Sequence, residues 1–329
     1  MRIVISGFGT VGQGFAEVLS LRSDLLNAGG GVRIVAVFDS KSYAVDENGL
    51  DPIMLIERKN ATGSVGTEKL SSGIEVLDSV GYDVLVEVSP TNIENGGDGL
   101  KNIEHALRNG KDVITVNKGP LALKFKELNK LAEKNNAILR FEGSVGGAMP
   151  IINLCSENLK GEKITSIRGI FNGTCNFILS RMDGGLPFEQ ALKEAQQLGY
   201  AESDPTYDIE GIDTACKVVI LANSVFRRNV RFSDVSITGI TSVSEDAIAL
   251  AADQNMVIRL IGEVSDTVLE VSPRLIPKGH PLSISGTLNT AKILTDLAGP
   301  ITISGKGAGR KETASAILSD LIAIMDRRR

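Results

Sequence analysis

The sequence predicts an α/β fold in which a Rossmann-type, doubly wound parallel sheet is joined to a second, α+β domain. Apolar strand patterns alternate with helical patterns through the first third of the chain. A glycine-rich hexapeptide lies where the first predicted strand meets the first predicted helix. The chain has 329 residues, more than one hydrophobic core usually serves. We therefore expect one domain formed by residues 1–140 with 306–329, and another formed by residues 141–305.

The first domain is predicted from its alternating elements. Strands are expected at residues 2–6, 32–38, 83–88, 112–116 and 137–141, and helices at residues 11–27, 100–108 and 121–134. Between residues 43 and 73, a high content of glycine, asparagine and serine predicts a less regular, mobile segment over one edge of the sheet. Ligands of such sheets bind at the carboxyl ends of the parallel strands.

The second domain begins where the pattern changes, near Gly143. Helices are expected at residues 149–158, 173–182, 187–198 and 211–223, and strands at residues 164–171, 256–264, 267–275 and 301–304. Together they predict one sheet covered by helices. The last helix, residues 313–326, is expected to pack back on the first domain. Gly305, Gly307 and Gly309 precede it and would let the backbone pass close to a ligand.

Composition argues against several classes of function. The net charge is −5 and the one basic run is the three arginines at residues 327–329, so nucleic acid is not an expected partner. The two histidines and three cysteines are too few and too widely spaced for a zinc site, a Ser-His-Asp triad or a disulfide framework. No membrane span or signal peptide is recognisable, which makes the cytoplasm the expected location. An enzyme with this inventory would use carboxylates and lysines as its acids and bases.

The glycine-rich hexapeptide is Gly7-Phe8-Gly9-Thr10-Val11-Gly12, which matches the G-x-G-x-x-G dinucleotide fingerprint. Gly7 permits the tight turn, Gly9 lets the backbone approach a pyrophosphate, and Gly12 allows close packing of helix on strand. The phosphates of NAD or NADP would then lie at the positive end of the helix. A lone match is weak, but here strand, turn and helix coincide, which favours a binding site over a simple glycine turn.

The residues that follow the strands bear on the choice of nucleotide. Asp39 would accept hydrogen bonds from the ribose 2′-hydroxyl of NAD and repel the 2′-phosphate of NADP. Ser40 and Lys41 follow, and Lys41 would attract that phosphate, so NAD is only slightly favoured. Ser89 would contact a ribose, and Lys118 would lie beside the nicotinamide. A solvated loop residue is the competing interpretation for Asp39 and for Lys118.

The densest polar cluster runs from Gly199 to Lys217 and has five carboxylates within residues 202–213. A predicted helix carries Asp213 and Lys217 at positions i and i+4, so both side chains point from one face. The next residues, 218–221, are apolar, so Lys217 is expected where the helix enters the core. From the residues alone, a surface ion pair is an equally good interpretation.

With these residues the sequence resembles the homoserine dehydrogenases. The match has the form A-x-x-x-G-Y at residues 195–200 and D-P-x-x-D-I-x-G-x-D-x-x-x-K at residues 204–217. Further matches are VNKGP at 116–120, EGSVGG at 142–147, NGTCN at 172–176 and GAG at 307–309. They extend over the whole catalytic core. With no aspartokinase domain before them and no ligand-sensing tail after them, a minimal, monofunctional enzyme is expected.

The resemblance implies the reversible, NAD(P)-dependent interconversion of L-aspartate 4-semialdehyde and L-homoserine, in threonine, methionine and isoleucine biosynthesis. Lys217 would be the general acid–base, since a lysine can transfer the proton if partial burial lowers its pKa towards neutrality. Lys118 would share the proton or polarise the carbonyl, and Asp213 would orient Lys217 or hold the substrate. Glu202 would bind the ammonium group of the substrate, and Thr174 would help to bind its carboxylate. Asp208 would support this arrangement. Cofactor contacts would include Gly199 and Gly309.

The resemblance also implies a monovalent-cation site. It would use the Glu142 side chain with the main-chain carbonyls of Val145, Gly147 and Met149. A homodimer is implied as well, with the second domain's sheet at the interface.

Two other functions stay open. An aspartate-semialdehyde dehydrogenase shares the substrate but needs an activated cysteine. Cys175 is the one plausible candidate, and no histidine lies near it in the sequence. A non-catalytic dinucleotide-binding protein would keep the fold and lose the reaction, which the presence of Lys118, Glu202, Asp213 and Lys217 argues against.

Overall fold

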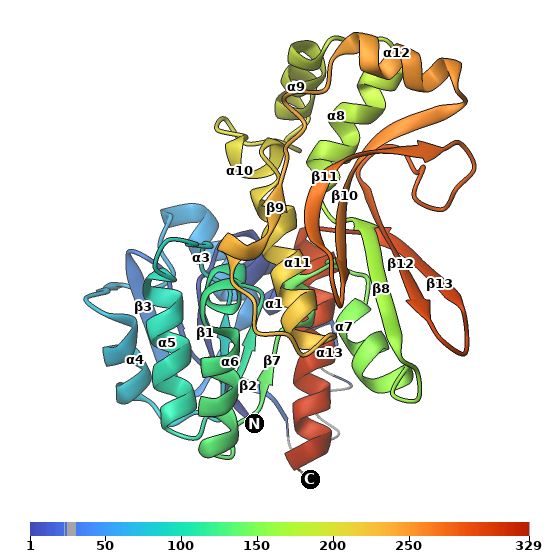
Figure 1. Ribbon diagram of the computed structural model, residues 1–329. Helices are drawn as coiled ribbons and strands as arrows, with labels where there is room; N and C mark the ends of the chain where they lie inside the picture. The colour runs from blue at the N-terminus through green and yellow to red at the C-terminus, as the bar shows by residue number, and fades with distance from the viewer. Residues whose placement is uncertain (23, 25–30, 329) are drawn as a thin grey trace. The chain divides into compact units, whose positions relative to one another are not determined.

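The computed structural model describes residues 1–22, 24 and 31–328, and they form two compact units (Figure 1). Unit 1 consists of Met1–Ser144 with Gly309–Arg329, and unit 2 of Val145–Ala308. Each unit has its own sheet and its own helices, and each is described separately below.

Unit 1 is built on a seven-stranded sheet with the order β4-β3-β2-β1-β5-β6-β7. Its strands are β1 (Arg2–Ser6), β2 (Arg33–Phe38), β3 (Ser42–Leu50), β4 (Glu68–Lys69), β5 (Val84–Glu87), β6 (Asp112–Thr115) and β7 (Leu139–Arg140). β1 pairs in parallel with β2 on one side and with β5 on the other. The carboxyl ends of β1 and β5 therefore form a topological switch point, where open α/β sheets bind ligands. The predicted Rossmann-type parallel sheet is confirmed.

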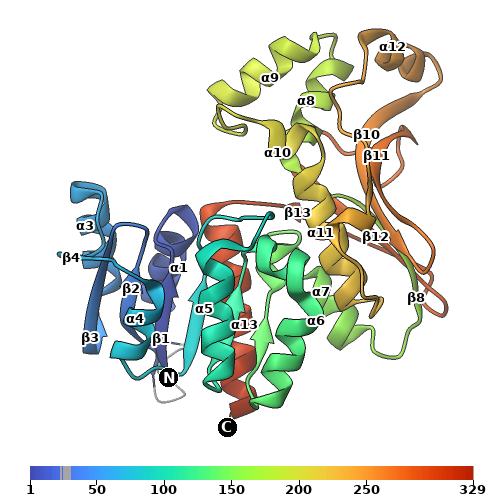
Figure 2. The same cartoon turned by 60° about the vertical axis from the view of Figure 1, so that its left-hand side comes forward.

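Helices cover both faces of this sheet. α1 (Thr10–Leu21) and α13 (Arg310–Arg328) pack on the face that carries Ile3 and Ile5. α4 (Gly73–Ser79), α5 (Gly97–Arg108) and α6 (Lys118–Lys134) pack on the other face, with Val4. Figures 1 and 2 show α5 and α6 side by side on their face of the sheet. Successive side chains of a strand point to opposite faces, so a strand buried on both faces is apolar throughout.

The prediction of a less regular segment at residues 43–73 is wrong. The segment contains most of β3, the helix α3 (Pro52–Thr62) and β4. β3 runs antiparallel to β2 and its middle is exposed, so it lacks the apolar pattern that reveals a buried strand. α3 buries only Leu55, and its start is fixed instead by Asp51, whose carboxylate accepts hydrogen bonds from the backbone N–H groups of Ile53 and Met54.

The predicted helices of unit 1 differ from the structure at one or both ends. The first begins at Thr10 and runs to Leu21, and the part predicted over residues 23 and 25–27 lies outside the described residues. The helix predicted from residue 121 starts earlier, at Lys118, because Asn117 caps it. Its side-chain oxygen accepts a hydrogen bond from the backbone N–H of Gly119 at 3.2 Å.

Unit 2 contains a six-stranded sheet with the order β13-β12-β8-β10-β11-β9. Its strands are β8 (Ile164–Ile170), β9 (Ser236–Ile237), β10 (Met256–Ser265), β11 (Leu269–Pro277), β12 (Leu288–Thr295) and β13 (Pro300–Lys306). Its helices are α7 (Ile151–Asn153), α8 (Gly173–Asp183), α9 (Phe188–Gln197), α10 (Thr206–Ile209), α11 (Ile212–Ser224) and α12 (Glu245–Asp253). The predicted α+β domain is confirmed.

Four elements of unit 2 were not predicted: the short elements α10 and β9, the strand β12 and the helix α12. β12 lies inside the sheet, but its polar residues Asn289, Thr290 and Lys292 interrupt the apolar pattern. α12 is a short, alanine-rich helix whose start is marked by Ser244, which accepts a hydrogen bond from the backbone N–H of Ala247. α11 packs against the sheet directly, since a Cβ atom on Gly262 of β10 would lie 2.8 Å from Val218. The buried helix α11 therefore has a fixed place on one face of the sheet.

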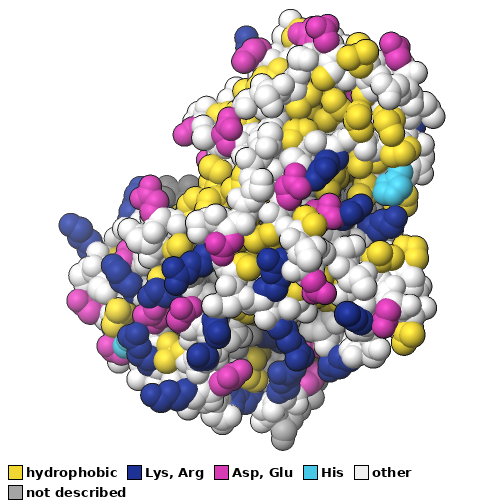
Figure 3. Space-filling view, viewed as in Figure 1, with side chains coloured by type: hydrophobic (Ala, Val, Ile, Leu, Met, Phe, Trp, Pro, Cys, Tyr) yellow, Lys and Arg dark blue, Asp and Glu magenta, His cyan; other side chains and the backbone are white. Residues whose placement is uncertain are grey.

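The surface carries charges of both signs. Figure 3 shows lysine and arginine side chains interspersed with acidic ones over the visible face of unit 1, without one continuous basic area. No helix in the described part of the chain has the length and apolar character needed to cross a bilayer.

Candidate active site

The glycine turn of unit 1 has the geometry of an anion-binding site. Gly7 has a φ of +96°, and a Cβ atom on it would lie 2.7 Å from the backbone nitrogen of Ser89. A Cβ atom on Gly12 would lie 2.2 Å from the carbonyl oxygen of Gly7. Gly9, in contrast, has no described atom within 4 Å of its Cβ position, and it begins α1 without a side-chain cap. The first N–H groups of α1 are thus left for a phosphate, whose approach at Gly9 nothing described obstructs.

The other residues of the turn divide between core and surface. Phe8 is buried in the core on the α1 side of the sheet, and Val11 packs against the same core. Thr10 and Gly9 are exposed. A cofactor contact from Phe8 would therefore come from its backbone and not from its ring.

Asp39 already has a partner that the sequence did not suggest. Its carboxylate accepts a hydrogen bond from Lys59 Nζ at 2.5 Å, and further bonds from the backbone N–H groups of Lys41 and Ser42. Burial raises the pKa of Asp39, but these bonds outweigh burial and hold its pKa below the usual value. Lys59 lies 20 residues away on α3, in the segment whose structure was not predicted. The negative charge that would repel a 2′-phosphate is thus balanced by a nearby ammonium.

Sequence reasoning also missed Glu87, which ends β5 fully buried beside the glycine turn. Its carboxylate accepts hydrogen bonds from the backbone N–H of Ser89 at 2.9 Å, from the Ser89 hydroxyl and from the Asn102 amide. Burial raises the pKa of Glu87, and the hydrogen bonds oppose that rise. An acidic residue at the end of an apolar strand was the available signal.

Lys118 stands at the carboxyl end of the neighbouring strand, β6, as the first residue of α6. The capping residue before it, Asn117, donates hydrogen bonds to the Ser89 hydroxyl oxygen and to the Pro90 carbonyl, both at 3.3 Å. Ser89 in turn bonds Glu87. The structure therefore joins Ser89 and the start of the Lys118 helix in one hydrogen-bonded network at the switch point.

In unit 2, Lys217 and Asp213 form a buried ion pair. Lys217 Nζ lies 2.6 Å from Asp213 Oδ2 and also donates to the carbonyl oxygen of Phe171 at 2.5 Å. Lys217 is 7% exposed and Asp213 6%. The surface ion pair that the sequence left open is therefore excluded.

A further missed residue, Asn172, joins this pair to Asp208. The Asn172 amide donates to Asp208 Oδ1 at 2.6 Å and to Asp213 Oδ2 at 3.0 Å. Burial and the charge of Asp213 raise the pKa of Asp208, while the amide of Asn172 acts to lower it. An asparagine directly before a predicted helix was the signal, because asparagine is a preferred N-cap. The structure thus brings the half-buried Asp208 together with the buried Asp213 and Lys217 in one cluster.

The other residues of unit 2 predicted to bind substrate or cofactor are Thr174, Glu202 and Gly199. Thr174 donates its hydroxyl to the Tyr200 carbonyl at 2.7 Å. Glu202 is exposed, and no contact in the described part of the chain joins its carboxylate to the cluster. Gly199 has a φ of +74° with no described atom within 4 Å of its Cβ position. In unit 1, Gly309 has a φ of +143°, which only glycine adopts readily.

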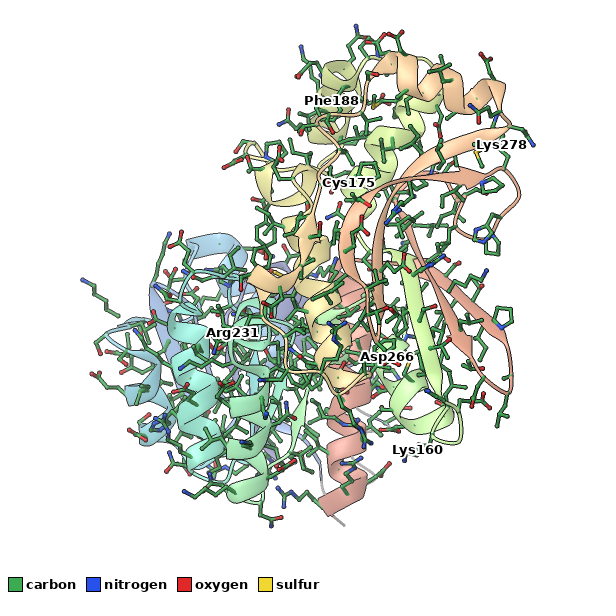
Figure 4. The ribbon with its side chains drawn as sticks, viewed as in Figure 1. Lys160, Cys175, Phe188, Arg231, Asp266 and Lys278 are labelled. Carbon is green, nitrogen blue, oxygen red and sulfur yellow. The ribbon has the colours of Figure 1, made fainter. Side chains whose placement is uncertain are left out.

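Cys175, labelled in Figure 4 within α8, is fully buried and donates to the Asp208 carbonyl at 3.1 Å. Burial raises the pKa of its thiol well above the usual value, and the charges of Asp208 and Asp213 add to the effect. A cysteine nucleophile acts as the thiolate, which this environment disfavours. The chemistry of an aspartate-semialdehyde dehydrogenase therefore lacks its nucleophile here.

The residues of the predicted cation site are oxygen donors of a suitable kind, but their arrangement about an ion stays a prediction. Glu142 is buried in unit 1, and its backbone N–H donates to Asp320 Oδ2 at 2.9 Å. In unit 2, Gly147 has a φ of +58° and packs against the backbone of Gly307. No group of three or more histidine, cysteine, aspartate or glutamate side chains among the described residues could hold a metal ion.

Comparison with known proteins gives consistent matches over both units. The family model "Homoserine dehydrogenase" matches residues 150–322, and "Homoserine dehydrogenase, NAD binding domain" matches residues 7–142. The chain is 50% identical to the homoserine dehydrogenase of Methanocaldococcus jannaschii, over 98% of each chain. It is 39% identical to the NAD(+)-dependent homoserine dehydrogenase of Pseudomonas canavaninivorans, over 98% of this chain and 96% of that one.

Solved structures match equally well. A crystal structure from Archaeoglobus fulgidus assigned to the same enzyme superposes with a TM-score of 0.92 at 48% identity, over 99% of each chain. A hyperthermophilic archaeal homoserine dehydrogenase in complex with NADPH gives a TM-score of 0.85 at 31% identity, over 98% of this chain and 96% of that one.

Proposed function

Because the chain belongs to the homoserine dehydrogenase family, we propose that its buried Lys217–Asp213 pair performs the proton transfer of that enzyme. The activity is the NAD(P)-dependent interconversion of L-aspartate 4-semialdehyde and L-homoserine, a reaction of amino-acid biosynthesis. The observation that carries the proposal is the burial of Lys217 between Asp213 and the Phe171 carbonyl. A buried ion pair gives little net stability for its desolvation cost, which favours a functional reason for it.

The proton must move to the substrate oxygen in one direction and away from it in the other. Lys217 donates a proton to the alkoxide as the semialdehyde is reduced, and accepts the hydroxyl proton as homoserine is oxidised. Asp213 and the Phe171 carbonyl hold the Lys217 side-chain nitrogen in place in both directions. When bound, the nicotinamide supplies the hydride or accepts it.

The ammonium group of the substrate requires a negatively charged partner, and its carboxylate requires a hydrogen-bond donor. Glu202 is exposed, so its carboxylate is available for the substrate ammonium. Thr174 already donates its hydroxyl hydrogen to Tyr200, so its help for the carboxylate comes from its backbone N–H in the first turn of α8. Asp208 supports Asp213 through the shared amide of Asn172.

Unit 1 holds the dinucleotide in this proposal. Gly7, Gly9 and Gly12 shape the phosphate turn, Ser89 contacts a ribose, and Lys118 polarises the substrate carbonyl or relays the proton. Asp39 favours NAD, and one relative is named as NAD(+)-dependent. Lys59 balances the Asp39 charge, and Lys41 adds another cation, which together admit NADP as a second cofactor. One homologous structure holds NADPH.

Two copies of the chain form a homodimer through the sheet of unit 2. Lys292, Arg168, Glu263 and Glu270 stand at paired positions on the adjacent strands β12, β8, β10 and β11. Paired residues share a face, and neighbouring Gly262 faces α11, so this charge row lies on the face away from α11. Two basic residues followed by two acidic ones are self-complementary about a twofold axis. A second copy is therefore the partner that fits this face.

The cytoplasm is the proposed location. Cys155, Cys175 and Cys216 are all buried, and none of them forms a disulfide among the described residues, which suits a reducing compartment.

The test is oxidation of L-homoserine with NAD and with NADP, measured side by side. The proposal predicts homoserine-dependent formation of reduced nicotinamide with both, at a higher kcat/KM for NAD. A protein that binds NAD but forms no reduced nicotinamide from homoserine would instead be a non-catalytic dinucleotide binder.

A further inference from the structure

The strongest feature without an assigned role is the side chain of Asn172. It lies between the end of β8 and the start of α8, and is buried. Its oxygen caps α8 by accepting a hydrogen bond from the backbone N–H of Cys175 at 2.8 Å. Its amide nitrogen donates to Asp208 at 2.6 Å and to Asp213 at 3.0 Å. The cap fixes the amide, and the amide then places both of its N–H groups on carboxylates of two other elements.

The same dipeptide also contacts the lysine. The carbonyl of Phe171, the residue directly before Asn172, accepts a hydrogen bond from Lys217 Nζ at 2.5 Å. Asp213 Oδ2 accepts from both Lys217 Nζ and Asn172 Nδ2. Two consecutive residues at the start of α8 therefore hold the ion pair: the Phe171 carbonyl binds the Lys217 ammonium, and the Asn172 amide binds the Asp213 carboxylate.

The chemistry of the cluster requires a neutral donor at this position. Asp208 is half-buried and Asp213 is buried, and the two carboxylates are close enough to share one amide. The charge of Asp213 raises the pKa of Asp208. A donor between them offsets their repulsion, while a third carboxylate would increase it. The surrounding titratable groups are Tyr207, Asp208 and Glu210 in or next to α10, Asp213, Cys216 and Lys217 of α11, and Cys175 of α8.

We propose that Asn172 is the positioning residue of the proton transfer: its amide bridges Asp208 and Asp213 and thereby aims Lys217 at the substrate oxygen. This inference rests on the function proposed above. It assigns Asn172 no contact with the substrate. Its effect on catalysis passes through Asp213 and Lys217.

The test compares Asn172→Asp and Asn172→Ser with the wild type. Aspartate and serine are both preferred N-caps, so α8 keeps its cap in either variant. Asn172→Asp replaces the bridging donor with a third carboxylate, and Asn172→Ser removes the bridge. We expect kcat to fall about 100-fold in Asn172→Asp, the size of effect that a small misplacement of a catalytic group produces. The added negative charge stabilises the Lys217 ammonium, so the pH midpoint of homoserine oxidation should rise by about one unit.

Asn172→Ser should lower kcat without that rise of the pH midpoint, because it adds no charge. The matched control is Asn176→Ser, one turn further along α8, where the amide donates to the Leu288 carbonyl and to neither carboxylate. The control should keep the wild-type pH profile, and all three variants should keep the wild-type Kd for NAD.

A wild-type kcat and pH midpoint in Asn172→Asp would overturn the inference and leave the proposed function intact, since the wild type would still oxidise homoserine. If Asn172→Asp does not fold, Asn172→Ser decides by its kcat: an unchanged value overturns the inference. Absence of homoserine oxidation in the wild type is a different result, and refutes the proposed function itself.

Discussion

Lys217 and Asp213 lie one helical turn apart on α11, with Nζ 2.6 Å from Oδ2 and both side chains buried. Helical neighbours at this spacing often pair on the surface, where the pair is worth little. Here α11 is buried along almost its whole length, so the pair is removed from water. Its ammonium is held on a carboxylate and a carbonyl, which gives the side chain the defined direction that the proposed proton transfer requires.

Replacing Asp213 by alanine should impair both catalysis and folding. Without its partner the Lys217 charge is buried uncompensated, so the free energy of unfolding should fall by about 3–5 kcal/mol. Turnover should fall by about 10²–10⁴-fold because the base loses its orientation. Without the carboxylate the ammonium is less stable, so the pH midpoint of homoserine oxidation should move down. An unchanged pH–rate profile would show that Asp213 and Lys217 are not coupled.

Glu202→Ala should raise the KM for homoserine about tenfold, the value of one charge-assisted hydrogen bond, and leave kcat nearly unchanged. The exposed position of Glu202 means that Tm should not change. Asp253→Ala, which removes an exposed carboxylate at the end of α12, serves as the control. An unchanged KM would remove Glu202 from the ammonium site.

Asp39 should influence both stability and cofactor choice. Its pKa is lowered in the folded protein, so its bonds stabilise the fold above the unfolded pKa and are lost as the pH falls through the folded pKa. Asp39→Asn should therefore be about 1–2 kcal/mol less stable than the wild type at pH 7, with the difference closing as the pH falls below about 4. Urea unfolding at several pH values measures this. Asp98→Asn, which breaks an exposed pair with Lys101, should show no such difference.

The same position separates the two nucleotides. Asp39→Ser removes the charge that repels a 2′-phosphate, so the ratio of kcat/KM for NADP to that for NAD should rise about tenfold. Lys59→Met should change the ratio in the opposite direction. Equal ratios in all three proteins would place the nucleotide choice elsewhere.

Arg168→Glu should weaken the proposed homodimer. Arg168 lies in the middle of the charge row, where its side chain is 55% exposed and pairs with Glu263 at 2.7 Å. Reversing its charge sets like charges against each other across the twofold axis. Light scattering should give a lower mass for this variant than for the wild type, and Lys160→Glu, outside the sheet, should leave the mass unchanged (Figure 4). A monomeric wild type would contradict the proposed assembly.

The elements that could be predicted were those with a local pattern. Gly7, Gly9 and Gly12 predict the glycine turn, and unbroken apolar runs predict the buried strands. β3 and α3 were missed because an exposed edge strand and a helix with one buried residue have no such pattern. β12 was missed because its interior place is set by pairing with β8 and β13, and not by its own polar residues.

The site followed the same rule. Lys217 and Asp213 are neighbours on one helix, so their pairing could be expected from spacing. The partners of Asp39 and Asp213 come from distant segments: Lys59 is 20 residues from Asp39, and Asn172 is 41 from Asp213. Spacing along a sequence does not show such contacts, which depend on how the elements pack.

The most direct test of the account is homoserine oxidation by Lys217→Ala, with the Kd for NAD measured on the same protein. A second variant, Lys217→Arg, keeps a cation beside Asp213 but cannot release its proton at neutral pH. The account predicts that kcat falls by about 10²–10⁴-fold in both variants while the Kd for NAD stays at the wild-type value. Turnover within a few-fold of wild type in either folded variant would contradict the assignment of Lys217 as the general acid–base.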